Sequence, residues 1–110
     1  MVKRKQTLIA DIGATNARIA LTSGKSFKKT EYLSLDQFDS IESLLKYYLD
    51  NFANEEIKKG ILGVAAPVLE DRVEFVNANI SFSKRALKNR FFKDDLIVLN
   101  DLVLQAYALQ

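Results

Sequence analysis

The first apolar segment of the chain carries an acid near its end and runs directly into a short polar turn, at residues 8–16. We expect Asp11, at the end of this predicted strand, to hold Mg²⁺ directly or through water, because this hard cation prefers oxygen ligands and keeps much of its hydration. Gly13 can take backbone angles closed to other residues, so the turn is expected to present N–H groups to a phosphate, with the Thr15 hydroxyl as a further donor. The predicted phosphate-binding residues are Gly13, Ala14, Thr15 and Asn16. The same residues also suit an ordinary hairpin, because turns favour them.

A second acid follows another apolar segment near the other end of the chain. Residues 96–99 form a short apolar run that leads into Asn100 and Asp101, and a helical pattern follows. In parallel α/β sheets, ligands collect outside the carboxyl ends of the strands. Asp11 and Asp101 would therefore face one cleft if their strands are neighbours in a parallel sheet.

The composition limits the chemistry. The 110 residues are enough for one domain with a modest core, spanning residues 1–110. The chain has no cysteine and no histidine, which excludes disulfides, thiolate zinc sites, Ser-His-Asp triads and cysteine nucleophiles within it. The formal net charge of +2 is spread along the chain and predicts no nucleic-acid partner. No apolar run approaches a membrane span and the start lacks a signal-peptide core, so we expect no membrane partner and a cytoplasmic location.

Three strands must position the first turn. They are predicted at residues 7–11, 17–22 and 27–35, as a meander. Asp36 is expected to cap a following helix, whose apolar residues recur at helical spacing as far as Asn54.

Strands and helices are predicted to alternate in the second half of the chain. A buried strand at residues 61–66 ends before the only proline and is expected to lie parallel to the first strand. A short strand at residues 72–76 precedes Ser83, which is expected to cap a helix over residues 84–92. This helix is predicted to bury Leu87 and Phe91 and to expose its charged side chains.

A last helix is predicted from Asp101 onward. The resulting element order is β-β-β-α-β-(β)-α-β-α, with right-handed crossovers. It predicts an α/β fold with a mixed sheet, in which a three-strand meander is followed by parallel strands and flanking helices.

Several motifs in this order resemble the N-terminal domain of bacterial glucokinases, members of the hexokinase-like and actin-like ATPase superfamily. Residues 11–21 are similar to the family's opening strand and turn, except that Ala14 replaces the second glycine. Ile80 stands nearest the place of a family tryptophan. The later motifs are matched by Pro67-Val68, Val76-Asn77, Asn100-Asp101 and Ala106-Tyr107-Ala108.

The resemblance implies a ribonuclease-H-like, actin-like ATPase fold and ATP-dependent phosphorylation of glucose or a related hexose. Asp101 would be the catalytic base and Asn100 a sugar ligand. The turn would hold the ATP phosphates, and Asp11 the Mg²⁺ shell. Asn77 either lines the sugar pocket or serves as a turn amide.

The resemblance also implies a larger C-terminal domain that is missing from this chain. The helix predicted from Asp101 has no stop signal, which suggests a truncated protein. Because the resemblance places further sugar ligands, a second phosphate loop and the adenosine pocket in the missing domain, we expect this chain to be inactive alone. Whether the complete protein forms a homodimer stays open. Two other functions stay open: a ribonuclease-H-like, metal-dependent nuclease or resolvase, which would need further acids in its cleft, and a non-catalytic sugar-sensing or structural ATPase domain of the same superfamily.

Overall fold

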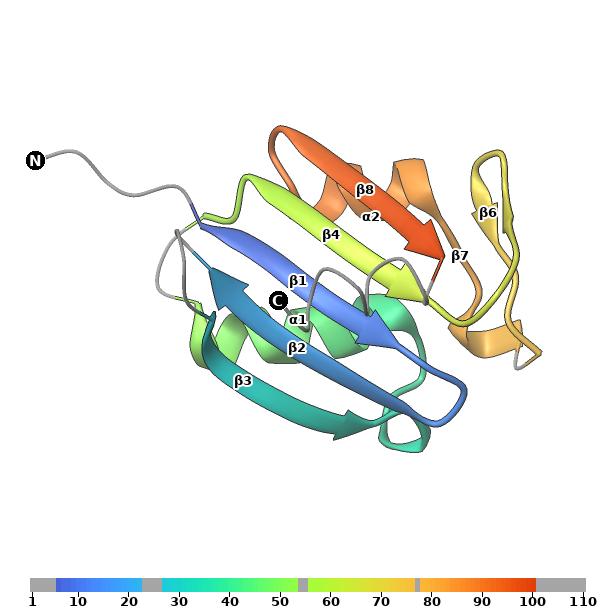
Figure 1. Ribbon diagram of the computed structural model, residues 1–110, viewed down its shortest axis with the longest axis horizontal. Coiled ribbons are helices and arrows are strands. Elements are labelled where there is room, and N and C mark those ends of the chain that lie inside the picture. Colours follow the sequence, from blue (N-terminus) through green and yellow to red (C-terminus); the bar gives the residue numbers. More distant parts are fainter. Residues whose placement is uncertain (1–5, 23–26, 54–55, 77, 101–110) are drawn as a thin grey trace, which may run out of the picture.

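A mixed five-stranded sheet forms the centre of the computed structural model, which describes residues 6–22, 27–53, 56–76 and 78–100 (Figure 1). The strand order is β3-β2-β1-β4-β8. β1 pairs in antiparallel fashion with β2, and β2 with β3, whereas β1, β4 and β8 run parallel. The strands are β1 (Thr7–Ile12), β2 (Asn16–Thr22), β3 (Phe27–Ser34), β4 (Lys59–Val64) and β8 (Asp95–Asn100). The predicted meander and the parallel pairing of its first strand are confirmed.

One face of the sheet is buried against two helices, α1 (Ile41–Phe52) and α2 (Lys84–Phe91), which lie behind the sheet in Figure 1. Side chains alternate between the faces of a strand. Leu8, Ala10 and Ile12 of β1 are fully buried in the core, so the odd-numbered residues of β1 lie on the opposite face. This alternation places Asp11 on the face of the sheet away from the helices.

The first helix begins later than the sequence predicts. Its N-cap is Ser40, whose hydroxyl accepts a hydrogen bond from the Ser43 N–H at 3.0 Å, while the Ser43 hydroxyl accepts from the Ser40 N–H at 3.1 Å. The prediction that Asp36 caps this helix is wrong, because residues Leu35–Gln37 form a separate 3-10 turn in which the Asp36 carboxylate accepts a hydrogen bond from the Ser34 hydroxyl. A reciprocal capping box satisfies two helix-end donors, which the lone Asp36 does not.

A bulge in β3 is held in place by a buried tyrosine. Lys29 has a positive φ of 56°, and the register of β2 with β3 shifts between Ile19 and Leu21. The Tyr48 hydroxyl donates to the Lys29 carbonyl at 2.7 Å. Burial, with a smaller contribution from the charge of Glu31, raises the pKa of Tyr48 to about 12, so the hydroxyl keeps its proton at neutral pH.

A second, smaller sheet was not predicted. It contains β5 (Val68–Leu69), β6 (Arg72–Val73) and β7 (Phe82–Ser83), in that order. The strand predicted at residues 72–76 therefore ends early, because β7 pairs with only two of its residues. β4 likewise ends at Val64 and not at residue 66.

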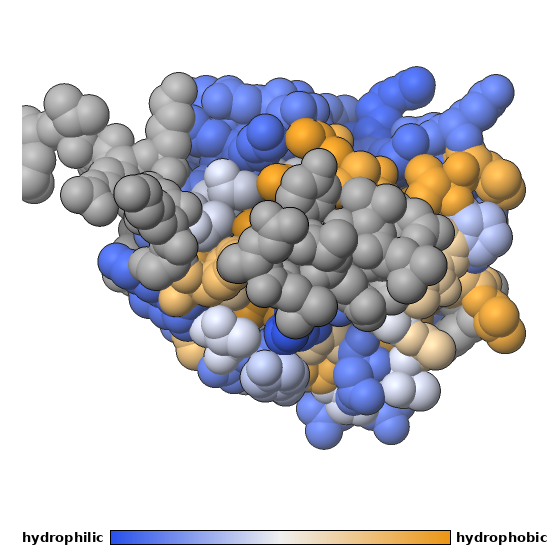
Figure 2. All heavy atoms as spheres, in the orientation of Figure 1, coloured by the Kyte–Doolittle hydropathy of each residue, from blue (hydrophilic) through white to orange (hydrophobic). Residues whose placement is uncertain are grey.

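The second helix follows this small sheet directly. The side chain of Ser83 accepts from the Ala86 N–H at 3.2 Å, which confirms the predicted cap. Leu87 is fully buried, but the aromatic ring that enters the core is that of Phe92, which is 2% exposed, whereas Phe91 is only partly buried. The border of the molecule over α2 and β8 is mostly hydrophilic (Figure 2).

The helix predicted from Asp101 lies outside the described residues. Within the part of the chain that the structure describes, no helix is both long enough and apolar enough to cross a membrane.

Candidate functional site

The carboxyl ends of three parallel strands meet at one edge of the sheet. The register pairs Ile12 of β1 with Val64 of β4, and Val64 with Asn100 of β8. Neighbouring strands lie about 4.8 Å apart, so the backbones of β1 and β8 are about 10 Å apart at this edge. β1 and β8 are not neighbours, since β4 lies between them, but both end where ligands collect in parallel sheets.

Two of the predicted site residues, Asn77 and Asp101, lie outside the described residues. Asn100 is the last residue of β8, and the structure describes its backbone. The other predicted residues, Asp11 and the turn at 13–16, lie at the end of β1 on the same edge.

Three backbone hydrogen bonds brace the turn between β1 and β2. The Gly13 N–H donates to the Asn16 carbonyl at 2.9 Å, and this bond closes the turn on itself. The Leu35 N–H donates to the Thr15 carbonyl at 2.8 Å, and the Ala65 N–H donates to the Ile12 carbonyl at 3.0 Å. The turn is therefore held from two sides, by the segment after β3 and by the segment after β4.

The role predicted for Gly13 is wrong in one respect. Its N–H is used within the turn, and its φ is not positive, so the turn does not depend on a conformation reserved for glycine. Among the described residues, a Cβ at this position would meet only the Asn16 carbonyl oxygen, at an ordinary 3.5 Å. Ala14 also has no positive φ and is exposed, so its methyl group is accommodated without backbone strain.

The donors that this turn leaves for a ligand are those of its two middle residues. Among the described residues, none accepts a hydrogen bond from the N–H of Ala14 or Thr15. The Thr15 hydroxyl oxygen accepts from the Asn16 side-chain amide at 3.0 Å, which leaves the hydroxyl hydrogen able to donate. Ala14 and Thr15 are both exposed. Successive N–H groups in a turn form a concave site suited to an anion.

Asp11 lies on the open face of the sheet beside Arg18. The Asp11 carboxylate and the Arg18 guanidinium are 4.0 Å apart, and their side chains are 20% and 40% exposed, so this is a loose, partly solvated pair. The pair borders a hollow of about 210 Å³. Besides the pair, the hollow is lined by Ile9, Ala20, Phe27, Thr30 and Tyr32.

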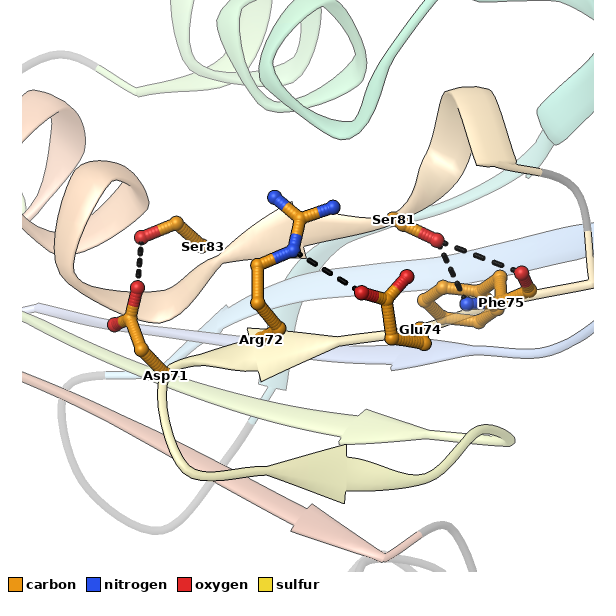
Figure 3. Close-up of polar contacts among 6 residues, drawn as sticks. All are labelled: Asp71, Arg72, Glu74, Phe75, Ser81 and Ser83. Carbon is orange, nitrogen blue, oxygen red and sulfur yellow. Dashed lines mark hydrogen bonds and ion pairs between the residues drawn. The ribbon is translucent and has the colours of Figure 1, made fainter.

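Three separate pairs of polar contacts lie among residues 71–75 and 81–83 of the chain, on either side of the predicted sugar ligand Asn77 in the sequence (Figure 3). The Phe75 N–H donates to the Ser81 hydroxyl at 2.8 Å, which joins the two stretches. Arg72 and Glu74 form an exposed ion pair at 3.3 Å. The sequence did not indicate this role of Ser81. Ile80 and Phe82 are buried and alternate with Ser81 and Ser83, but a pattern of four residues is too short to predict a strand.

Asp71 ties the small sheet to α2. Its carboxylate accepts from the Ser83 hydroxyl and from the Arg85 N–H, the latter at 2.8 Å, and its carbonyl accepts from the Lys84 N–H at 2.7 Å (Figure 3 shows the Ser83 contact). The Ser83 hydroxyl, followed by the Arg85 N–H, holds the pKa of Asp71 below its usual range, since both bonds favour the ionised form.

Asp71→Asn is expected to destabilise the protein at neutral pH, and this loss should shrink as the pH falls below about 4, the usual aspartate pKa. The folded state lowers the pKa of Asp71, so its ionised form contributes stability above the unfolded pKa and loses it as the pH falls through the folded pKa. Urea unfolding of both proteins at pH 7 and pH 3 measures the effect, with Glu70→Gln as a control for losing a neighbouring exposed carboxylate. A gap between Asp71→Asn and the parent protein that is equal at both pH values would contradict the prediction.

Comparison with known proteins adds an independent observation. The family model described as Glucokinase matches residues 8–110, which include the braced turn, Asp11 and the end of β8. The chain belongs to the glucokinase family. The glucokinase of Campylobacter jejuni subsp. doylei is 36% identical over 103 residues, covering 93% of this chain and 31% of its own length. The glucokinase of Saccharophagus degradans is 32% identical, covering 92% of this chain and 33% of its own length.

Solved structures of glucokinases share this fold. A glucokinase from an Antarctic psychrotroph matches 96% of this chain and 35% of its own, with a TM-score of 0.87 and 28% identity. A Balamuthia mandrillaris glucokinase in complex with glucose matches 96% of this chain and 32% of its own, with a TM-score of 0.70 and 19% identity, a likeness of fold. The chain spans about a third of the length of the glucokinases it matches.

Proposed function

We propose that the complete protein phosphorylates glucose with ATP as the phosphoryl donor, and that this chain supplies one wall of the cleft. Membership of the glucokinase family supports the reaction. The observation that supports the site most is the braced turn: two N–H donors without acceptors among the described residues lie in the turn that follows the end of β1, at the edge where β8 also ends.

The roles of the chain's own residues follow from phosphoryl-transfer chemistry. Asp101 would accept the proton of the sugar 6-hydroxyl as its oxygen attacks the γ-phosphorus, and the bond to the leaving ADP oxygen breaks. Asn100 and Asn77 would position the sugar, because an amide can donate to one hydroxyl and accept from another. The N–H groups of Ala14 and Thr15, with the Thr15 hydroxyl, would hold phosphate oxygens.

The donor set around Asp11 fits Mg²⁺ bound with a nucleotide. Mg²⁺ in such sites takes one or two carboxylates, together with phosphate oxygens and water, and Asp11 offers one partly exposed carboxylate at a strand end. When bound, the cation would neutralise charge on the phosphate oxygens. Arg18 would keep its place beside the same carboxylate.

The domain assignment belongs to the same proposal. The sheet order β3-β2-β1-β4-β8, antiparallel and then parallel, supports a ribonuclease-H-like, actin-like ATPase fold. Residues 1–110 would form the N-terminal domain, and a C-terminal domain would supply the adenosine pocket and further sugar ligands. We place the complete protein in the cytoplasm and leave its assembly as a homodimer to measurement.

The nuclease alternative receives less support. Two-metal nucleases need several carboxylates around their ions. In residues 6–22, 27–53, 56–76 and 78–100, no group of three acidic side chains comes together.

Glucose-dependent ADP formation by the complete product of the reading frame tests the proposed function. We expect turnover with ATP, Mg²⁺ and glucose, and none when glucose is omitted. Other hexoses, assayed in parallel, define the substrate class. No turnover with any hexose, together with metal-dependent cutting of a branched DNA duplex, would replace the proposal with the nuclease alternative.

A further inference from the structure

The carbonyl of Thr15 is held by a residue far along the chain. Leu35 follows β3 directly and starts the 3-10 turn Leu35–Gln37. Its N–H donates to the Thr15 carbonyl at 2.8 Å. The preceding register pair, Asn16 with Ser34, keeps the two segments side by side up to this bond. The peptide unit that follows Thr15 is therefore fixed by the segment that connects β3 to α1.

Leu35 is itself firmly anchored. Its side chain is 4% exposed and belongs to the main hydrophobic core. Its carbonyl accepts from the Phe38 N–H at 3.2 Å, which closes the 3-10 turn. The Ser34 hydroxyl donates to the Asp36 carboxylate at 2.6 Å across the same turn. A donor with so little freedom can hold its acceptor in one orientation.

The bond from Leu35 holds Thr15, a residue whose own N–H is among the donors left for a ligand. The Thr15 carbonyl is bonded, whereas the N–H groups of Ala14 and Thr15 have no acceptor among the described residues. The Leu35 bond fixes the peptide unit directly after these two donors, and the bond from the Gly13 N–H to the Asn16 carbonyl fixes the unit directly before them. Restraining the donors from both sides before a phosphate arrives removes part of the ordering cost of binding. The turn cannot supply this restraint alone, because its internal bond joins Gly13 to Asn16 and leaves the Thr15 carbonyl free.

We propose that Leu35 is a positioning residue for phosphate binding: its backbone N–H holds Thr15 so that the turn binds the phosphates of the nucleotide. This inference rests on the proposed function and deepens it. It assigns the connection between β3 and α1 a part in nucleotide binding and no part in glucose binding. Leu35 touches no substrate in this role and acts through Thr15.

Leu35→Pro removes the backbone N–H that donates to the Thr15 carbonyl and is expected to leave the backbone conformation at this position unchanged. The first residue of a helical turn tolerates proline, and Ser34, with φ −84° and ψ 128°, has the extended conformation that a residue before proline requires. Leu35→Val is the matched control, because it trims the same buried side chain and keeps the N–H. Both variants are made in the complete protein.

We expect Leu35→Pro to weaken binding of Mg-ADP, measured by titration calorimetry, about three- to tenfold relative to Leu35→Val, the range for one lost hydrogen bond. The KM for ATP should rise by a similar factor, with the KM for glucose unchanged within about twofold. Equal Mg-ADP affinities in the two variants would overturn the inference, as would an equal rise in both KM values.

A second pair of variants serves if Leu35→Pro does not fold. Asp36→Ala removes the carboxylate that holds Ser34 across the exposed turn, and Asp50→Ala removes an exposed carboxylate that accepts at the same 2.6 Å from Lys46 on α1. Only Asp36→Ala should weaken Mg-ADP binding, by about twofold, since it loosens the turn that carries the donor. Equal affinities in this pair would overturn the inference. A parent protein that neither binds Mg-ADP nor turns over glucose would instead overturn the proposed function, and the inference with it.

Discussion

Asp101→Asn in the complete protein is expected to lower kcat for glucose phosphorylation about 10²- to 10⁴-fold, the usual contribution of a general base. Asparagine has the size and shape of aspartate but cannot take up the hydroxyl proton. The KM for glucose should change much less, because the amide can still hydrogen-bond to the sugar. Steady-state rates of ADP formation at saturating ATP measure both constants.

Asp94→Asn is the control for this experiment. Asp94 is an exposed acid just before β8, and its backbone N–H, which Asp94→Asn keeps, donates to the Lys58 carbonyl at 2.8 Å. Its replacement should leave kcat unchanged. An Asp101→Asn protein that keeps more than a tenth of the parent turnover would remove Asp101 from the role of catalytic base.

Gly60→Ala is expected to destabilise the protein by about 1–3 kcal/mol, as an overpacked core does. A Cβ on Gly60 would lie 2.6 Å, 2.7 Å and 3.0 Å from three atoms of the Phe92 ring. Because Phe92 is 2% exposed, its ring has little room to withdraw. Urea or thermal unfolding of the complete protein gives the change in the free energy of unfolding.

Two further variants test this cause. The free energy of unfolding of Gly13→Ala should lie within about 0.5 kcal/mol of the parent value, because its Cβ would make one ordinary contact, at 3.5 Å, with the part of the chain that the structure describes. Combining Gly60→Ala with Phe92→Leu should cost less than the sum of the two single changes, since the smaller side chain vacates part of the space. Strict additivity of the two changes would show that the clash with Phe92 is not the reason.

Local patterns were sufficient for the elements whose signals are long. The apolar runs on either side of the polar turn in residues 7–22 predict β1 and β2 as a hairpin, and the helical spacing predicts α1 with its buried residues. Boundaries were less certain where two signals compete. Asp36 and Ser40 both suit a helix start, and the reciprocal bonds of Ser40 with Ser43 decide between them.

Elements that depend on distant partners could not be predicted in this way. β7 and β6 are two-residue strands that exist because they pair with each other, and no local pattern of that length distinguishes a strand. Phe91 and Phe92 are adjacent aromatic residues, and only the structure shows that it is the Phe92 ring that packs over Gly60 in the core. The position of β4 between β1 and β8 is likewise a matter of long-range pairing.

The sequence by itself determined which residue types the candidate site offers: a turn of small and hydroxyl residues that follows an acid, with a second acid after another apolar segment, in a chain without cysteine or histidine. Only the tertiary structure decided which groups of the turn can meet a ligand. It commits the Gly13 N–H to the turn and leaves those of Ala14 and Thr15 without acceptors among the described residues. The physical reason is that the sequence does not distinguish one backbone N–H or carbonyl from another. Which of them pair, as the Leu35 N–H does with the Thr15 carbonyl and the Ala65 N–H with the Ile12 carbonyl, is set by the packing of the whole sheet.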